Sequence, residues 1–231
     1  MLMEIKDLDV FYGKAQAVHS AELHVEQGEM VFLVGRNGAG KTTIMRTIAG
    51  FNKSGPGSVI HFNGEPIDKY PPEDIARRGI RYVFQDKRVI TKLTVRENIH
   101  LAAYPFGESP EEAVATVCNI YPRIEKFLDI KAGGLSGGQR QLLLIGRALI
   151  GKPKLLLIDE PTEGLAAGII NDVFQVLSHL KGEVSMLIVE QNLDLVRRLA
   201  DRIYAMKEGR ILMDLNNTGS DSGSAELEQF L

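Results

Sequence analysis

Residues 30–42 read MVFLVGRNGAGKT, and this stretch decides the fold class of the 231-residue chain. Its first part, from Met30 to Val34, is a continuous apolar run, which predicts a strand of a parallel sheet buried on both faces. The part from Gly35 to Thr42 fits the pattern of glycine, any four residues, glycine, lysine, and serine or threonine. A helix pattern follows from Lys41 to about Ala49. This order of strand, glycine-rich loop and helix predicts a site for the phosphates of a nucleoside triphosphate.

Each residue type in the glycine-rich loop suits phosphate binding. Glycines allow backbone N–H groups to turn inward around an anion, and the helix N-terminus adds a partial positive charge. Lys41 is expected to reach the β- and γ-phosphates, and the Thr42 hydroxyl is expected to bind Mg²⁺. A glycine turn that carries a lysine by chance is the alternative, which the flanking strand and helix disfavour. The predicted ATP-binding residues of this segment are Arg36, Asn37, Gly38, Ala39, Gly40, Lys41, Thr42 and Thr43.

Two carboxylates follow a second buried strand, which runs from Leu155 to Ile158. Asp159 is expected to emerge beside the phosphates and to bind Mg²⁺ directly or through water. Glu160 is expected to point to the other side of the pleat, where it could polarise a water for in-line attack on the γ-phosphate. A solvated strand end is the alternative for this dipeptide. A kinase would instead need a pocket for an acceptor hydroxyl, and no segment indicates one.

Strands and helices alternate along the rest of the chain, which predicts an α/β fold with a largely parallel sheet. A helical insert is expected over residues 87–150. Within it, Thr94 and Glu97 form a capping-box pattern before a helix over Asn98 to Tyr104, and Ser136 caps a second helix that Pro153 ends. Short strands are predicted within Met3 to Val25, and further strands at Val59 to Phe62 and at Met186 to Val189. Residues Arg202 to Met206 and Ile211 to Met213 are predicted to pair as a hairpin.

Composition and charge narrow the class of protein further. The chain is 44% hydrophobic and 25% charged, as is typical of a folded globular protein. Its net charge of −3 gives no basic excess for nucleic acid, so we expect no nucleic-acid partner. The single cysteine, Cys118, excludes a disulfide framework within the chain. Because no apolar run is long enough to span a membrane and the N-terminus does not read as a secretory signal, we expect a cytoplasmic chain whose membrane role is peripheral.

A third motif, LSGGQ at residues 135–139, decides the family. Alone, it is a serine cap followed by two glycines at the start of a helix, although its exposed backbone N–H groups form a second anion site. Together with the loop at 35–42 and the acidic pair at 159–160, it resembles the nucleotide-binding subunit of an ATP-binding-cassette (ABC) transporter. The resemblance covers the chain from Met3 to about Asp214. It implies a P-loop NTPase cassette with a mostly parallel core sheet, an N-terminal antiparallel β subdomain and a helical signature subdomain.

The resemblance also implies domains, partners and ligands. We expect a RecA-like ATP-binding core with its β subdomain over residues 1–86 and 151–214, and the helical subdomain over 87–150. Residues 215–231 are expected to form a polar, mostly solvated tail with a short terminal helix. In this family two cassettes pair head to tail, so the expected partners are a second cassette, two membrane permease subunits and an external solute-binding protein. The chain would act at the cytoplasmic face of the membrane with ATP and Mg²⁺.

Residue roles carried over from the family complete the predicted site. Tyr12 would stack on adenine with Val18 nearby, and Gln85 would sense Mg²⁺ and the γ-phosphate. The predicted metal residues are Thr42, Gln85 and Asp159, and the predicted catalytic residues are Glu160, as the base, and Gln191. ATP held by the partner cassette would be contacted by Ser136, Gly137, Gly138 and Gln139.

Several stretches are similar to the shorter cassette of importers for branched-chain amino acids and of related urea and amide systems. They are residues 119–123 (NIYPR), 145–149 (IGRAL), 161–165 (PTEGL) and 188–192 (IVEQN). A cassette of a urea or amide importer and a cassette of an exporter remain alternatives. So does a soluble ABC ATPase, although such proteins usually carry two cassettes or a long coiled coil, whereas this chain has one copy of each motif.

Two positions depart from the usual family pattern. Gln191 replaces a histidine, and an amide can donate a hydrogen bond to the γ-phosphate but cannot become cationic. Ala166 and Ala167 stand where an aspartate usually contacts the partner cassette. A hydrolytically weak member of a heterodimer is therefore a further alternative.

The segment after Gln85 belongs to the family region that holds a cytoplasmic helix of the membrane subunit. Val89, Ile90 and Leu93 are expected to supply apolar contacts to that helix. Internal packing of the helical insert is the alternative for these three side chains.

Overall fold

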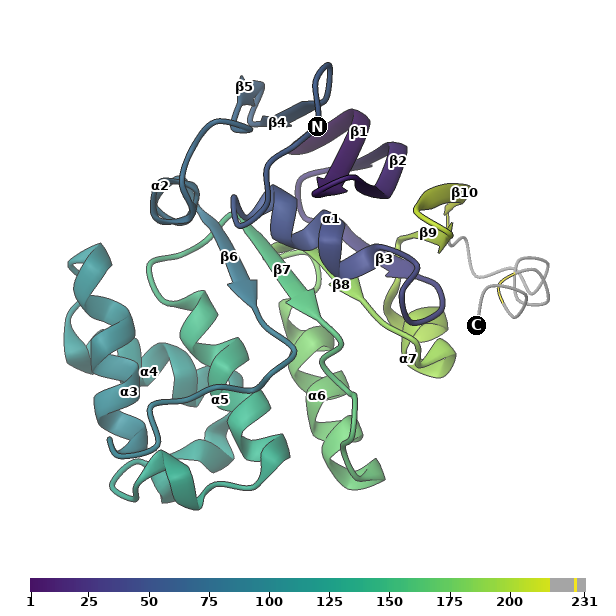
Figure 1. Ribbon diagram of the computed structural model, residues 1–231. Helices are drawn as coiled ribbons and strands as arrows, with labels where there is room; N and C mark the ends of the chain where they lie inside the picture. Colours follow the sequence, from purple (N-terminus) through teal and green to yellow (C-terminus); the bar gives the residue numbers. More distant parts are fainter. Residues whose placement is uncertain (217–226, 228–231) are drawn as a thin grey trace.

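A six-stranded core sheet runs through the part of the chain that the computed structural model describes, residues 1–216 and 227 (Figure 1). The strand order is β10-β9-β3-β8-β7-β6, and every neighbouring pair is parallel except β10 and β9. This arrangement confirms the predicted α/β fold with a mostly parallel sheet. The strands are β3 (Met30–Val34), β6 (Ile80–Val83), β7 (Leu155–Asp159), β8 (Ser185–Val189), β9 (Arg202–Lys207) and β10 (Arg210–Asn216).

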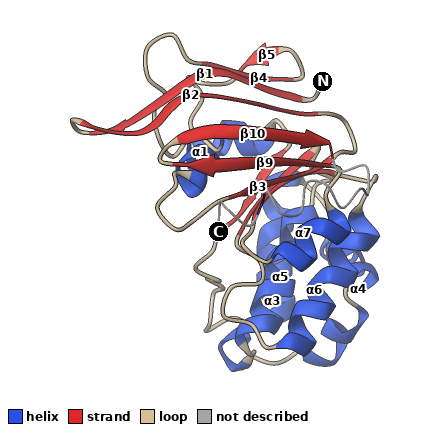
Figure 2. Cartoon of the chain, turned by 90° about the vertical axis from the view of Figure 1, so that its right-hand side faces the viewer, coloured by secondary structure: helices blue, strands red, loops and turns tan. Residues whose placement is uncertain are grey.

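A second, antiparallel sheet lies over one face of the core sheet (Figure 2). Its strand order is β2-β1-β4-β5, and β1 and β2 form a hairpin that turns at Gly13, where φ is 63°. The first two strands were expected to be short, but they contain 10 and 11 residues because they pair with each other along most of their length. The bounds are β1 (Met3–Tyr12), β2 (Ala15–Val25), β4 (Val59–Phe62) and β5 (Glu65–Pro66).

Helix α1 (Lys41–Ile48) is held between the two sheets (Figure 2). Val31 and Leu33 of β3 pack into the apolar cluster on this side, together with Ile44 and Ile48 of the helix. The alternate residues of β3, including Phe32, pack into the cluster on the opposite side. All five residues of β3 are buried, as the continuous apolar run predicted. The two-sided packing fixes the position at which the chain leaves β3 and enters the glycine-rich loop.

The other face of the core sheet is covered by helices (Figures 1 and 2). Thr94, Ser109 and Ser136 each cap a helix through a capping box. The helix after Thr94 was expected over Asn98 to Tyr104, but it begins at Val95 and ends at Ala103, because the capping box starts the helix directly after its serine or threonine. The helices on this face are α3 (Val95–Ala103), α4 (Pro110–Ile120), α5 (Gly137–Leu149), α6 (Ala167–Leu180) and α7 (Leu193–Leu199), with 3₁₀ turns at Tyr104–Phe106, Pro122–Phe127 and Ala132–Gly134. Helix α2 (Pro72–Arg77) lies on the opposite side, where its Ile75 packs into the same apolar cluster as α1.

The C-terminal boundary differs from the expectation. Strand β10 continues to Asn216, so Leu215 and Asn216 belong to the sheet and not to a polar tail, because they pair with β9. Leu227 is buried at 2% exposure, and the rest of the expected tail and its short helix lie outside the described residues. Within residues 1–216 and 227, no helix has the length and apolar character that crossing a bilayer requires.

Candidate functional site

The glycine-rich loop joins β3 to α1 and lies against strand β9. Gly35 has a φ of 149°, and a Cβ atom at this position would lie 2.2 Å from the backbone oxygen of Met206. No side chain fits there, so the loop depends on glycine at its first position. The backbone of the loop is thereby held close to the sheet, at the N-terminus of α1.

Lys41 begins α1 and turns its side chain back over this loop. Its Nζ atom donates to the carbonyl oxygens of Gly35 at 2.6 Å and Arg36 at 3.0 Å, and lies 3.8 Å from Glu160 Oε1. The side chain is 4% exposed. Burial lowers the pKa of the Lys41 amine, while nearby carboxylates, first among them Glu160, oppose this shift. The ammonium group is thus placed where an anion cradled by the loop would meet it.

Asp159 is the last residue of β7 and is almost fully buried. Its Oδ1 accepts a hydrogen bond from Thr42 Oγ1 at 3.1 Å, and its Oδ2 accepts one from the Tyr82 hydroxyl at 2.8 Å. Burial raises the pKa of Asp159, and the hydrogen bonds from Tyr82 and Thr42 counteract that rise. A carboxylate beside a threonine hydroxyl is a pair of hard oxygen donors, which fits Mg²⁺ when phosphate and water supply the remaining ligands.

Tyr82 was not predicted as a site residue. It lies on β6 opposite Leu157 of β7, close to the end of the strand that carries Asp159. Burial and the neighbouring carboxylate raise the pKa of its phenol well above the usual range, so Tyr82 stays protonated and acts as a donor. The sequence offered only a tyrosine in the short segment IRYV, three residues before Gln85.

Glu160 directly follows β7 and has a φ of 47°, a left-handed conformation that is uncommon outside glycine. Its backbone N–H donates to the Val189 oxygen at 2.9 Å. The expected alternation along the pleat does not apply to Glu160, because the chain has already left the strand. Glu160 lines the cleft and approaches Lys41, while the buried Asp159 contacts the neighbouring Thr42.

Two glutamine amides hold the Glu160 carboxylate. Gln191 Nε2 donates to Glu160 Oε1 at 2.8 Å and also to Asn37 Oδ1 at 2.8 Å. Gln85 Nε2 donates to Glu160 Oε2 at 3.2 Å and to Glu163 Oε2 at 2.7 Å. The structure therefore brings three predicted residues together, and adds Glu163, which the sequence did not single out.

Glu160, Gln85 and Asn37 border a cleft of about 540 Å³, whereas Gln191 and Asp159 are not among its lining residues. Tyr12 is 52% exposed at the end of the β1–β2 hairpin, where its hydroxyl accepts a hydrogen bond from Asn52. Val18 is fully buried, so the structure does not bring its side chain to the cleft. The residues that line the cleft are Gln16, Ala17, His19, Asn37, Gly38, Gly40, Lys41, Thr42, Thr43, Gln85, Glu160, Glu208 and Gly209, of which the segments around Gln16 and Glu208 were not predicted.

The LSGGQ segment lies apart from this cleft, at the start of α5. Ser136 Oγ accepts from the Gln139 backbone N–H at 3.2 Å, and Gln139 Oε1 accepts from the Ser136 backbone N–H at 2.8 Å. None of its residues borders the cleft of the same chain. The LSGGQ segment therefore does not contribute to the cleft of its own chain.

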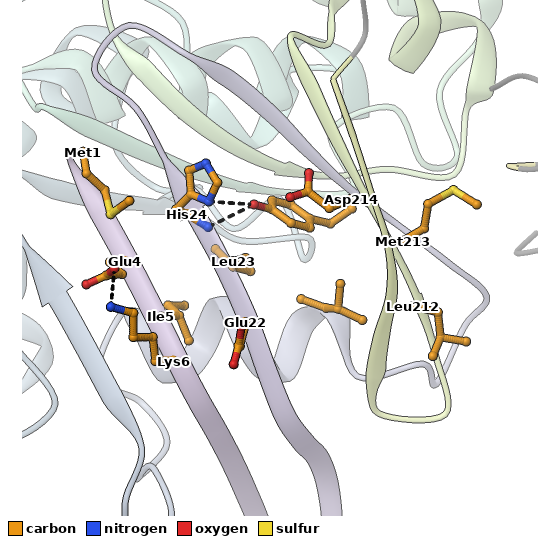
Figure 3. Close-up of a pocket in the computed structure, with 12 residues that line it drawn as sticks. Met1, Glu4, Ile5, Lys6, Glu22, Leu23, His24, Leu212, Met213 and Asp214 are labelled. Atoms are coloured by element: carbon orange, nitrogen blue, oxygen red, sulfur yellow. Dashed lines mark hydrogen bonds and ion pairs between the residues drawn. The ribbon is translucent and has the colours of Figure 1, made fainter. Parts of the chain in front are cut away.

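A second cavity, of about 370 Å³, lies between strands β1 and β2 and the edge strand β10 (Figure 3). Several of its polar groups pair with one another. Lys6 Nζ lies 2.7 Å from Glu4 Oε1, and the Tyr204 hydroxyl is 3.2 Å from both Nδ1 and the backbone nitrogen of His24. Because these groups are already satisfied and carry no phosphate-binding loop, we place the candidate site in the first cleft.

Residues 18–163 match the model of the ABC transporter family, and the chain belongs to this family. The chain is 39% identical to the high-affinity branched-chain amino acid transport ATP-binding protein BraG of Pseudomonas aeruginosa, over 95% of this chain and 94% of that protein. It is 31% identical to a probable branched-chain amino acid transport ATP-binding protein, LivF, of Archaeoglobus fulgidus, over 100% of this chain and 96% of that one.

Solved structures give the same assignment. A nucleotide-free ATP-binding cassette from an ABC transporter superposes with a TM-score of 0.84 at 28% identity, covering 99% of this chain and 95% of that one. A structure described as the ADP conformation of an ATP-binding cassette of an ABC transporter gives a TM-score of 0.81 at 28% identity, with coverages of 99% and 98%. The protein is therefore an ABC-type ATPase cassette.

Proposed function

We propose that this chain is the ATP-binding and hydrolysing subunit of an ABC importer, and that the cleft at Lys41 is its ATP site. The observation that carries the proposal is the convergence of four side chains from segments far apart in the sequence. Lys41 and Thr42 from the start of α1 meet Asp159 and Glu160 from the end of β7, with contacts of 3.1 Å and 3.8 Å between them. An ammonium, a metal-binding pair and a carboxylate base are the parts that phosphoryl transfer to water requires.

Each residue of the cleft has a distinct proposed role in ATP hydrolysis. Lys41 and the loop backbone bind the β- and γ-phosphates, and Thr42 and Asp159 hold Mg²⁺, with Gln85 positioned nearby to sense it. When bound, the metal neutralises the charge that develops on the phosphate oxygens. Glu160 orients the attacking water and accepts its proton, and Gln191 donates a neutral hydrogen bond beside it.

The second half of each ATP site comes from a second cassette. The anion site at Ser136 and the following glycines is remote from the chain's own cleft, so it is available to a nucleotide held by a partner. A cassette structure with a TM-score of 0.82 and 25% identity is described as dimeric, which supports this arrangement. Nucleotide that binds better between two closed cassettes shifts the pair toward closure, and hydrolysis removes that preference.

The transported solute is proposed to be a branched-chain amino acid. The support is the names of BraG and LivF, which the chain matches over nearly its whole length and theirs. Two membrane permease subunits and an external binding protein would complete the importer, with this chain at the cytoplasmic face. Urea, amides and export from the cell are the alternatives for the solute and its direction.

A groove of about 790 Å³ is proposed as the seat of the permease. It lies between β6 and helices α3 and α5, and the guanidinium of Arg81 stacks at 3.9 Å on the Phe106 ring inside it. Val89, Ile90 and Leu93 do not line this groove. Val89 packs against the core, and Ile90 is 41% exposed. The lining residues are Arg46, Arg81, Tyr82, Val83, Phe84, Asp86, Arg88, Leu101, Ala102, Pro105, Phe106, Leu144, Arg147 and Ala148.

The ATP site is tested with Glu160→Gln, which keeps the size of the side chain and removes its basicity. We expect ATP to bind with unchanged affinity, a nucleotide-bound dimer to accumulate, and turnover to fall by a factor on the order of 10² or more. The exposed Glu183→Gln is the matched control and should hydrolyse ATP like the wild type. Wild-type turnover in Glu160→Gln would remove Glu160 from the role of base.

The solute is tested by uptake in cells that lack the gene. We expect loss of labelled leucine and valine uptake, restored by the wild-type gene and not by Glu160→Gln. If leucine uptake is retained and urea or amide uptake is lost, the transported solute is urea or an amide and not a branched-chain amino acid. Accumulation of a compound inside the deletion strain would indicate export instead.

A further inference from the structure

Glu190 is a buried carboxylate at the end of β8, with 3% of its surface exposed. Its Oε1 accepts hydrogen bonds from the backbone N–H of Thr162, at 3.0 Å, and from the Thr162 hydroxyl. Its Oε2 accepts from the backbone N–H groups of Gln191, at 2.7 Å, and Asn192, at 2.9 Å. Each of these contacts is a donor, so the ionised carboxylate satisfies all of them.

These hydrogen bonds join two segments that carry the chemistry of the cleft. Thr162 lies two positions after Glu160, whose backbone is held in the left-handed conformation at a φ of 47°. Gln191 supplies the amide that donates to Glu160 Oε1. The Glu190 side chain therefore fixes the backbone at Thr162, which follows the proposed base Glu160. It also fixes the backbone of Gln191, whose side chain contacts Glu160.

We propose that Glu190 is a positioning residue for ATP hydrolysis: through Thr162 and Gln191, it fixes the Glu160 carboxylate in its place beside the γ-phosphate site. Glu190 itself does not line the cleft, and its effect passes through the two segments it joins. This inference rests on the proposed function. The hydrogen bonds of Glu190 go to Thr162, Gln191 and Asn192, and its charge influences the pKa of Lys41 less than the charges of Glu160 and Asp159 do. We therefore expect the carboxylate to act mainly on the chemical step and only weakly on nucleotide binding.

The central variant is Glu190→Gln, which preserves size and replaces one acceptor oxygen with a donor. The NH₂ group of the glutamine then faces either the two Thr162 donors or the N–H groups of Gln191 and Asn192. That pair of donors loses its hydrogen-bond acceptor. Small displacements of a catalytic group lower rates strongly, so we expect kcat to fall about 10- to 100-fold. The KM for ATP should stay within about twofold of the wild type, because uniform binding is not changed.

A matched control separates positioning from folding. Ser185 lies at the opposite end of β8, is 2% exposed, and accepts a hydrogen bond from the Gly28 N–H at 2.9 Å. Ser185→Ala also removes a buried hydrogen bond on this strand and should lower the melting temperature while leaving kcat unchanged. Thr162→Val and Thr162→Ser form a second pair of variants. Thr162→Val loses the hydroxyl hydrogen bond to Glu190 and should lower kcat, whereas Thr162→Ser keeps this bond and should not.

The experiment measures kcat and the KM for ATP on the cassette dimer, with hydrogen exchange of residues 160–163 and 190–192 as a second readout. We expect Glu190→Gln to exchange faster in both segments and to lose kcat at constant KM. Unchanged kcat in Glu190→Gln, or an equal loss in Ser185→Ala, would overturn the inference. If Glu190→Gln does not fold, equal kcat in Thr162→Val and Thr162→Ser would overturn it. Absence of turnover in the wild-type dimer would overturn the proposed function instead.

Discussion

Replacing Gly138 with alanine will show whether this glycine of the LSGGQ segment is required by the packing of the chain itself. A Cβ atom on Gly138 would lie 2.2 Å from Cγ2 of Ile169 and 3.0 Å from its Cβ and Cγ1. Ile169 belongs to α6, so the added carbon meets a neighbouring helix. A Cβ atom on Gly137 would find no atom within 4 Å, and Gly137→Ala is therefore the matched control.

The size of the effect follows from these distances. Carbon atoms pack at about 3.5–4.0 Å, so the contact with Cγ2 is far too short. Rotating χ1 of Ile169 moves its γ carbons but leaves its Cβ in place, and β-branched side chains in helices strongly prefer one rotamer. Helices α5 and α6 must therefore move apart, at a cost of about 1–3 kcal/mol, against a gain of up to about 1 kcal/mol from the helix propensity of alanine.

Thermal and urea unfolding of the nucleotide-free chain measure this difference. At roughly 2–4 °C per kcal/mol for a chain of this size, the steric cost of about 1–3 kcal/mol should make Gly138→Ala melt about 2–12 °C below Gly137→Ala, which gains helix propensity without the steric cost. Adding Ile169→Ala removes the γ carbons, so the double variant should recover part of the loss in a double-mutant cycle. Equal stability of the two glycine variants, or no recovery with Ile169→Ala, would refute the packing argument and leave Gly138 to nucleotide binding alone.

Further substitutions test individual contacts of the cleft. Tyr82→Phe removes a hydrogen bond to the Asp159 carboxylate that is worth about 1.5–3 kcal/mol. Without this bond, burial raises the pKa of the Asp159 carboxyl further. The Mg²⁺ concentration for half-maximal hydrolysis should therefore rise about 10- to 100-fold at pH 7. Gln191→His introduces an imidazole with an ordinary pKa of about 6.5. The kcat/KM of this variant, divided by that of the wild type at the same pH, should therefore change between about pH 5.5 and 7.5. A ratio that does not change with pH would contradict this. Glu163→Ala removes the 2.7 Å contact to the Gln85 amide, and hydrogen exchange around Gln85 should become faster in the nucleotide-free chain; unchanged exchange would count against a hold by Glu163.

Local sequence patterns were sufficient for most of the fold. The apolar run at Met30–Val34 became the buried strand β3, and the predicted capping box at Thr94 and the predicted cap at Ser136 became helix starts. These features depend on neighbours within a few residues. The length of the β1–β2 hairpin and the pairing of Leu215 and Asn216 with β9 depend on partner strands, which local patterns do not specify.

The site was only partly predictable for the same reason. The glycine-rich loop and the acidic pair are contiguous motifs, so their chemistry can be read directly from residue order. Tyr82, Glu163 and Glu190 act through partners 77, 78 and 28 residues away. The left-handed turn at Glu160 also redirected its side chain, because alternation along a strand no longer applies after the strand ends.

The contacts of Glu160 explain how nucleotide occupancy can control the base. Oε1 accepts the Gln191 amide at 2.8 Å and lies 3.8 Å from Lys41 Nζ, while Oε2 accepts the Gln85 amide at 3.2 Å. A carboxylate that already accepts from neighbouring donors holds a water less well, because its lone pairs are shared. Under the proposed function, phosphate oxygens compete for Lys41 and for the Gln85 amide, while the Gln191 amide, whose backbone Glu190 fixes, keeps Oε1 in place. Binding of the substrate would therefore free one carboxylate oxygen of the base that acts on it.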